Sequence, residues 1–337
     1  MPLPTHFARA LALLCLVLMA IGVARASEPL FSVDGTPQTE DHLPASLQQV
    51  LFDARLAHYK KQLEIIDAAL LELAIERRAK AAGQTPEAFV RTLFAVPTPS
   101  DADVKAFYNE HKARIRYPLN AVRDQLRQMM VQRGIQAKKA ELVATFKRES
   151  IIDIGIKKPV APYANIATDG LPSKGNSNAK VTLIEFADYQ CPHCKQAAGV
   201  LSRIAKRFPN DLRVVFMDLP INPSGISRAI AEGAACADQQ GRFWEFHDLA
   251  FERQSALVKG SAVQFANELK LDADAFQHCL NSEFPKQRVA KSEDQARALG
   301  LSSTPTLFLN GRKLHVHNME AELVEAIEKA LGEKAGA

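Results

Sequence analysis

The sequence predicts an α/β domain preceded by a mostly α-helical domain. Three observations support this division. Apolar residues recur at helical spacing through about the first 150 residues, Pro and Gly interrupt the chain at 157–179, and two short apolar runs flank a helical segment after residue 180. Two parallel strands joined by a helix form a βαβ unit. The 337 residues are enough for two hydrophobic cores.

The first 26 residues have the pattern of a secretory signal sequence. His6 and Arg9 precede an apolar run over residues 10–23, and Ala24-Arg25-Ala26 offers a small-x-small cleavage site. The run is shorter than the roughly 20 residues that a membrane-spanning helix needs. We therefore expect export, with cleavage before Ser27.

Cleavage would change both the cysteine count and the charge. Cys15 would leave with the signal; Leu14 before it stands where a lipoprotein signal has a small residue, so lipidation is not expected. Four cysteines remain, an even number that permits two disulfides outside the cytosol. The formal net charge of +4 would fall to +2 without Arg9 and Arg25. Such a near-neutral chain argues against a nucleic-acid partner.

The N-terminal domain is expected to be built from helices with recognisable ends. Gly83 is a stop signal, and Thr85 then caps a short helix that has Pro86 in its first turn. Ser100 with Asp103 three residues later indicates a second cap. The expected segments are one long helix or two joined ones at 46–82, a short helix from 86, a helix from 100 to 115 and a final helix to about 149.

The C-terminal domain is expected from about Lys180, after an interdomain linker at 157–179. Asn310-Gly311 is a strong signal for a two-residue hairpin turn. The expected elements are a strand at 181–186, a helix from 191 to about 208, a strand at 212–216, a helical insertion at about 224–299, strands at 306–309 and 313–316, and a final helix at about 320–331. That order is typical of the α/β thioredoxin fold with an inserted helical subdomain.

Cys191-Pro192-His193-Cys194 lies at the junction of the first strand and its helix. The first sulfur of such a pair lies at the helix N-terminus, where unpaired N–H groups and the positive end of the dipole favour the thiolate. Half of a four-cysteine zinc site would need a second close pair of ligands. None follows at zinc-finger spacing, so we expect a redox pair and no metal.

Three motifs in order resemble the DsbA-like thiol–disulfide oxidoreductases of the thioredoxin superfamily. They are the Cys-Pro-His-Cys that follows Glu185-Phe186-Ala187-Asp188, then Phe243-Trp244-Glu245-Phe246-His247-Asp248, then Ser303-Thr304-Pro305-Thr306. The resemblance covers about residues 160–335. It implies that Thr304 and Pro305 bind the substrate chain, with Pro305 in the cis form that only about 5–6% of X-Pro bonds adopt. It also implies that Glu185 is buried below the active site.

The redox residues have expected roles, with alternatives for two of them. Cys191 is the expected nucleophile, because the first Cys of such a motif is the more exposed, and Cys194 then resolves the mixed disulfide. His193 either stabilises the thiolate, which we favour, or is simply an exposed polar residue. Glu185 either carries protons during exchange or is a salt-bridged structural residue.

The helical insertion contains the two other mature cysteines. We expect Cys236 and Cys279 to form a structural disulfide rather than to remain two isolated buried thiols. Phe243, Trp244 and Phe246 are expected to be core residues rather than a peptide-binding platform.

The N-terminal domain is similar to the helical module of SurA-type periplasmic chaperones and prolyl isomerases. The similarity rests on the order of the helices, on Val33-Asp34-Gly35-Thr36-Pro37 and on the segment from Pro99 to Tyr108. It implies peptide holding or dimerisation; without a parvulin domain near Tyr117, prolyl isomerase activity is not implied. A helical spacer, whose Leu/Met stripe is only core, is an equal alternative.

These features predict an exported, periplasmic thiol–disulfide oxidoreductase without a cofactor. It would oxidise cysteine pairs in unfolded or cysteine-containing exported proteins, with a membrane quinone reductase of the DsbB kind as redox partner. A homodimer through the helical module is compatible with this function. The alternatives are a disulfide isomerase or reductase, in whose relatives Thr also precedes the cis proline, and a client-binding holdase with secondary redox activity.

Overall fold

The computed structural model describes residues 29–112 and 114–332, so the expected signal sequence and Cys15 lie outside the described residues. The chain divides into two compact units at Pro44. In the first, β1 (Phe31–Val33) and β2 (Thr36–Gln38) form an antiparallel hairpin, followed by the 3-10 turn η1 (Glu40–His42). Asp34 and Gly35 both have positive φ, as a type I′ turn requires. We did not predict this hairpin, although Asp-Gly is its sequence signal.

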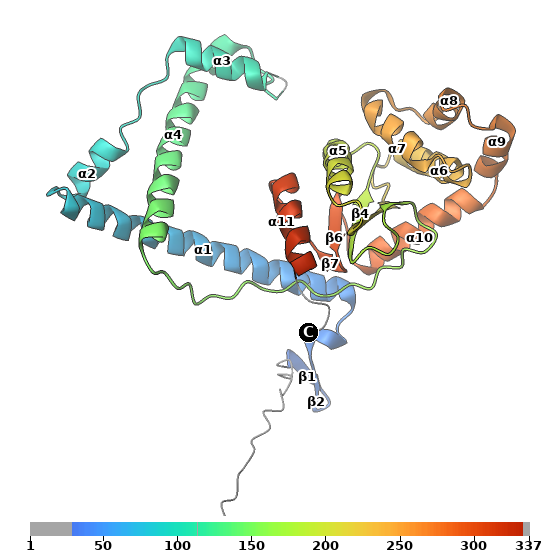
Figure 1. The fold of residues 1–337 in the computed structure, drawn as a ribbon, viewed down its shortest axis with the longest axis horizontal. Coiled ribbons are helices and arrows are strands. Elements are labelled where there is room, and N and C mark those ends of the chain that lie inside the picture. The colour runs from blue at the N-terminus through green and yellow to red at the C-terminus, as the bar shows by residue number, and fades with distance from the viewer. Residues whose placement is uncertain (1–28, 113, 333–337) are drawn as a thin grey trace, which may run out of the picture. The chain divides into compact units, whose positions relative to one another are not determined.

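The second unit begins with four helices, α1 (Ala45–Ala81), α2 (Pro86–Leu93), α3 (Asp101–His111) and α4 (Leu119–Glu149) (Figure 1). The expected boundaries agree to within a few residues, and the first segment is one helix. Thr85 accepts a hydrogen bond from the Ala88 N–H, and Ser100 forms a capping box with Asp103. The caps therefore begin α2 and α3 where the sequence indicates.

The core of this helical region is small. Leu70 and Ala74 of α1 pack on Leu142 and Phe146 of α4. Leu47, Val50, Ile65 and Leu73 of α1 remain about half exposed. Helix α1 therefore has exposed apolar side chains that are not part of this small core.

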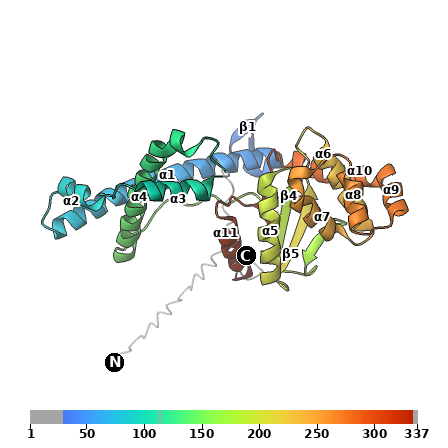
Figure 2. The same ribbon diagram turned by 90° about the horizontal axis from the view of Figure 1, so that it is seen from above.

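A five-stranded sheet organises the C-terminal domain, in the order β3-β5-β4-β6-β7. Two of its strands, β4 and β5, are labelled in Figure 2. Its strands are β3 (Ser173–Gly175), β4 (Val181–Ala187), β5 (Leu212–Asp218), β6 (Thr306–Leu309) and β7 (Arg312–Lys313). β4 and β5 are parallel and are joined through α5 (Pro192–Arg207), whereas β3 and β6 pair antiparallel with β5 and β4. The predicted βαβ unit and thioredoxin-like order are both present.

Side chains alternate between the two faces of a strand, so the apolar residues of β4 and β5 lie on both faces of the sheet. Helices cover each of these faces. Leu183 and Val214 face Leu201 of α5 and Leu323 of α11 (Met319–Gly332). The opposite face, which includes Phe186, packs on the end of α10. Five helices fill the insertion: α6 (Ile226–Gln239), α7 (Phe243–Glu252), α8 (Ser261–Glu268), α9 (Ala273–Asn281) and α10 (Phe284–Ala298), with the 3-10 turn η2 (Gln254–Ala256) after α7.

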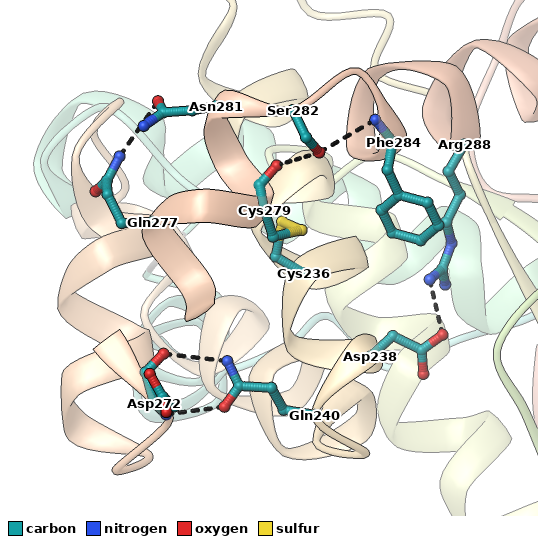
Figure 3. The surroundings of a disulfide bond; sticks show 10 residues. All are labelled: Cys236, Asp238, Gln240, Asp272, Gln277, Cys279, Asn281, Ser282, Phe284 and Arg288. Carbon is teal, nitrogen blue, oxygen red and sulfur yellow. Dashed lines mark hydrogen bonds and ion pairs between the residues drawn. A yellow bond between two sulfur atoms is a disulfide. The ribbon is translucent and has the colours of Figure 1, made fainter. Parts of the chain in front are cut away.

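A disulfide joins Cys236 of α6 to Cys279 of α9 (Figure 3). Its two Cα atoms lie 5.7 Å apart, and both residues are buried in the core of the insertion. Phe243 and Phe246 belong to the same core, as expected. Trp244 is only partly buried, and its indole N–H donates to the Ser173 carbonyl oxygen at 3.2 Å.

Two expected boundaries need correction. Residues 157–179 are not all linker, because Ser173–Gly175 pairs with β5 and extends the sheet. Ala164 N–H also donates to the Gly311 carbonyl oxygen at 2.7 Å. A polar three-residue edge strand has no apolar alternation, so its sequence resembles a loop. The last strand was also expected at 313–316, but it spans only Arg312–Lys313.

No helix in the described ranges combines the length and the apolar character needed to cross a bilayer.

Candidate active site at the start of helix α5

Cys191 lies at the N-cap of α5, with Pro192 in the first turn. Pro suits this position because its missing N–H would have had no partner inside the helix. Cys191 is partly exposed, and its thiol donates to the Thr304 carbonyl oxygen at 3.3 Å. The reactive sulfur of the motif is therefore accessible and faces the loop before β6.

Cys194 lies one turn further along α5, on the face that packs into the domain. Both cysteines of the motif are free thiols in this structure, and Cys194 is fully buried. Burial raises the pKa of the Cys194 thiol, because an apolar environment disfavours the thiolate. The backbone of Asp188 and the Thr304 hydroxyl act in the opposite direction on this pKa.

The loop opposite the motif contains Thr304 and Pro305, joined by a cis peptide bond. The Thr304 Oγ1 atom is buried and lacks a partner with full hydrogen-bond geometry, although it lies near enough to Cys194 to influence that thiol. The structure therefore brings together the redox motif and the loop that the sequence predicts as the substrate site.

Glu185 lies in β4, on the same face as Leu183 and therefore below α5. It is 2% exposed, and its Oε1 atom has no hydrogen-bond partner. Burial raises the pKa of Glu185 to about 8, and the positive charge of Lys174 opposes this shift. The ionised form of Glu185 in turn raises the pKa of Cys194, so the two groups are electrostatically linked.

Lys174 of the edge strand β3 was not found from the sequence. Its Nζ atom lies 3.9 Å from the centre of the Trp244 ring, a cation–π geometry. Burial lowers the pKa of Lys174, whereas Asp248 and Glu185 raise it. No motif marks this lysine, and it was assigned to the linker.

A groove of about 850 Å³ is lined by His193 of the redox motif and by Pro305. His193 and Gln196 of α5 form one wall, Ser303 and Pro305 a second, and residues 313–320 a third. His193 is exposed in this groove.

Asp188 holds the turn that leads from β4 into the motif. Its carboxylate accepts hydrogen bonds from the N–H groups of Gln190 at 2.6 Å and Asn222 at 3.0 Å, and from the Ser227 hydroxyl. Each hydrogen bond to a charged group typically contributes about 1.5–3 kcal/mol. In the sequence, Asp188 stands out only as the last residue of the Glu-Phe-Ala-Asp motif. Its role in holding the turn could not be predicted, because its partners Asn222 and Ser227 lie 34 and 39 residues away in the chain.

The fold and these thiols define a class of protein, the thioredoxin-like proteins with a dithiol at the start of the first helix of the βαβ unit. The thioredoxin family model matches residues 168–329. The C-terminal half of the chain is thus a thioredoxin-like domain.

Curated relatives match about half of this chain. The Na(+)/H(+) antiporter NhaA 1 of Salinispora arenicola is 35% identical over 175 residues, which cover 51% of this chain and 26% of the antiporter. The antiporter NhaA of Herminiimonas arsenicoxydans is 36% identical over 157 residues, 47% of this chain and 25% of the antiporter. The chain thus spans about a quarter of the length of these relatives.

Solved structures also match about half of this chain. Oxidised BdbD from Bacillus subtilis has a TM-score of 0.47 and 26% identity, covering 52% of this chain and all of that chain. The thiol-disulfide exchange protein alpha-DsbA2 from Wolbachia pipientis has a TM-score of 0.44 and 21% identity, covering 47% and 86%. The catalytic domain of Proteus mirabilis ScsC has a TM-score of 0.43 and 20% identity, covering 48% and 90%.

Proposed function

We propose that this protein is a periplasmic dithiol oxidase, which introduces disulfides into exported proteins through Cys191 and Cys194. The observation that carries the proposal is the unequal access of the two thiols. Cys191 is partly exposed at a helix N-terminus, and Cys194 is buried directly behind it. An accessible sulfur can exchange with a client while a shielded one closes the internal disulfide.

The reaction starts from the Cys191–Cys194 disulfide form of the enzyme. A client thiolate attacks Cys191 Sγ, the bond between the two enzyme sulfurs breaks, and Cys194 leaves and takes up a proton. A second client thiolate then attacks the client sulfur of the mixed disulfide and expels Cys191 as a thiolate. Two electrons pass from the client to the enzyme, which ends in the dithiol state that the structure has.

Glu185 is the proposed proton donor to Cys194. Its pKa of about 8 keeps the carboxyl group protonated at neutral pH, and the raised pKa of Cys194 favours proton uptake by the leaving sulfur. The reverse transfer accompanies reoxidation of the enzyme. His193 is exposed at the same helix N-terminus, and we assign it the electrostatic role.

The proposed client site is the groove lined by His193 and Pro305. A client chain in extended conformation would face Pro305 and the Thr304 carbonyl oxygen. In this structure that oxygen accepts a hydrogen bond from the Cys191 thiol. Reoxidation would require a membrane quinone reductase of the DsbB kind. The signal-like residues 1–26 support export to the periplasm.

The helical region α1–α4 is proposed to be a SurA-like module that gathers clients or a second copy of the chain. The half-exposed Leu47, Val50, Ile65 and Leu73 of α1 support this role. If the module dimerises the chain, disulfide isomerisation becomes the stronger alternative to oxidation. A holdase with secondary redox activity and a plain spacer are the other outcomes of the tests below.

The test is the redox chemistry of the cysteine pair. The reduction potential of the pair can be measured by equilibration with glutathione. We expect a value closer to that of DsbA, about −120 mV, than to that of thioredoxin, about −270 mV. Cys191→Ser should abolish oxidation of a dithiol peptide, and Cys194→Ser should trap mixed disulfides with clients. Trapping by Cys191→Ser instead would reverse the roles, and a thioredoxin-like potential would point to a reductase.

A further inference from the structure

The side chain of Gln254 connects the helical insertion to the redox motif. Gln254 lies in η2, at the end of α7, and is partly buried. Its Nε2 atom donates to the carbonyl oxygen of Tyr189 at 2.8 Å and to that of Cys191 at 2.9 Å. One amide nitrogen has two hydrogens, so both bonds can form at once. A single side chain therefore spans the turn that places the reactive cysteine.

The Cys191 carbonyl oxygen is the acceptor on which several donors converge. The N–H groups of Cys194 and Lys195 point to it at 3.1 and 3.2 Å, and Gln254 adds a third donor. This oxygen carries negative partial charge within the same residue as the reactive sulfur. Donors directed at it offset that charge and reduce its repulsion of a thiolate at Cys191.

The rest of the same segment supports the contact. Lys195 Nζ donates to the Glu252 carbonyl oxygen at 3.0 Å, and the rings of Tyr189 and Phe251 lie 5.0 Å apart. The end of α7 and the start of η2 thus contact the first turn of α5 at several points. Within α7 and η2, both of which the structure describes in full, Gln254 is the residue whose side chain donates to the backbone of Cys191.

We propose that Gln254 is a positioning residue for the redox site, which holds the Tyr189–Cys191 turn and stabilises the thiolate state of Cys191. The inference rests on the proposed function of the cysteine pair. A thiolate stabilised in the reduced protein makes the disulfide form a stronger oxidant. Gln254 therefore raises the oxidising power of the pair from a subdomain outside the sheet.

Two substitutions in the full chain test this role, and different results are expected for them. Gln254→Met keeps the length of the side chain but removes the donor, and Gln254→Lys keeps a donor and adds a positive charge. The matched control is Gln240→Met. Gln240 also makes two hydrogen bonds, to the backbone of Asp272, but within the insertion and away from the motif (Figure 3).

The measurement is the equilibrium of each full-length protein with glutathione, followed by alkylation and mass spectrometry, with thermal unfolding recorded in parallel. Gln254→Met should shift the equilibrium toward the disulfide by up to about tenfold, because the whole energy of one lost hydrogen bond is the upper limit of the difference between the two redox forms. Gln254→Lys should leave it unchanged or shift it toward the dithiol, and Gln240→Met should leave it unchanged.

Two results would overturn the inference. One is a Gln254→Met protein with the wild-type equilibrium; the other is an equal shift in the same direction for Met and Lys, which would indicate lost packing. If the Gln254→Met protein does not fold, the Gln254→Lys protein alone tests the proposal. A shift of its glutathione equilibrium toward the disulfide would contradict the proposal. A wild-type protein that never equilibrates with glutathione would instead refute the proposed function, independently of Gln254.

Discussion

At the scale of single residues, the two thiols of the motif lie in different surroundings although only two residues separate them. Cys191 stands outside the first turn of α5, whereas Cys194 follows the buried face that continues through Ala197 and Leu201. That asymmetry arises because Cys191 is the N-cap at the exposed start of the helix and Cys194 lies one turn in, and it could be predicted from the sequence. The raised pKa of the buried Glu185 carboxyl could not be predicted from the sequence, because it depends on burial in the folded domain and on Lys174 of another strand.

Glu185→Gln should remove a pH dependence of stability. The pKa of Glu185 is raised to about 8 in the folded protein, so the folded state binds more protons than the unfolded state between about pH 4.5 and 8. Stability of the wild-type protein should therefore fall as pH rises through this window. The Gln variant should be more stable than wild type at pH 8, by on the order of 4 kcal/mol, and equal to it below pH 4.5.

Urea unfolding of both proteins at several pH values measures this difference. The variant should also exchange disulfides more slowly near neutral pH, if Glu185 supplies the proton to Cys194. Parallel stability curves across the window would show that Glu185 is already ionised in the folded protein.

At the scale of elements, the edge strand β3 explains why part of the expected linker is ordered. Gly175 has φ of +89°, and a Cβ atom at this position would lie 2.1 Å from the Leu212 carbonyl oxygen. Only glycine permits so close an approach of two backbones. The strand also delivers Lys174 to Trp244, so the electrostatics below the active site depend on this edge.

Gly175→Ala should destabilise the C-terminal domain more than Gly170→Ala does. Gly170 also has a positive φ, of +72°, but a Cβ there would meet nothing within 4 Å. We expect a loss of about 1 kcal/mol for Gly170→Ala and on the order of 2–4 kcal/mol for Gly175→Ala, because the second change adds a steric clash. Thermal or urea unfolding of the two variants provides the comparison, and equal losses would contradict the paired edge strand.

The disulfide between α6 and α9 should stabilise the insertion without taking part in exchange. Replacing Cys236 and Cys279 together by Ala should cost about 3–4 kcal/mol, from closure of a loop with a sequence separation of 43 under the chain-entropy treatment. Peptide mapping of the unreduced protein should find the two cysteines joined. The glutathione equilibrium of Cys191 and Cys194 should not change in the double variant, and a shift would show that the two cysteine pairs are coupled.

At the scale of the whole molecule, the redox residues and the helical region belong to different parts of the sequence. Helices α1–α4 contain no cysteine and, among their described residues, no group of His, Cys, Asp and Glu that could hold a metal. A second binding surface on the same chain raises the local concentration of a client, up to the millimolar range for short flexible tethers. The region is therefore expected to act on large clients rather than on the thiols.

Removal of residues 27–156 should leave oxidation of a short dithiol peptide nearly unchanged and should slow oxidation of large unfolded proteins. Light scattering of the full and shortened chains separates dimerisation from client holding. If the shortened protein keeps its oligomeric state and oxidises large clients equally well, the helices are only a spacer.

The amino-acid sequence by itself determined the helices, the βαβ unit and the redox motif of this protein. Those features depend on local signals: apolar periodicity, caps, turn residues and the spacing of two cysteines. Only the tertiary structure decided that Lys174 lies near Glu185 and that Gln254 holds the Cys191 turn. These contacts join residues without a periodic pattern and, for Gln254, 63 positions apart, so they exist only after the chain has folded.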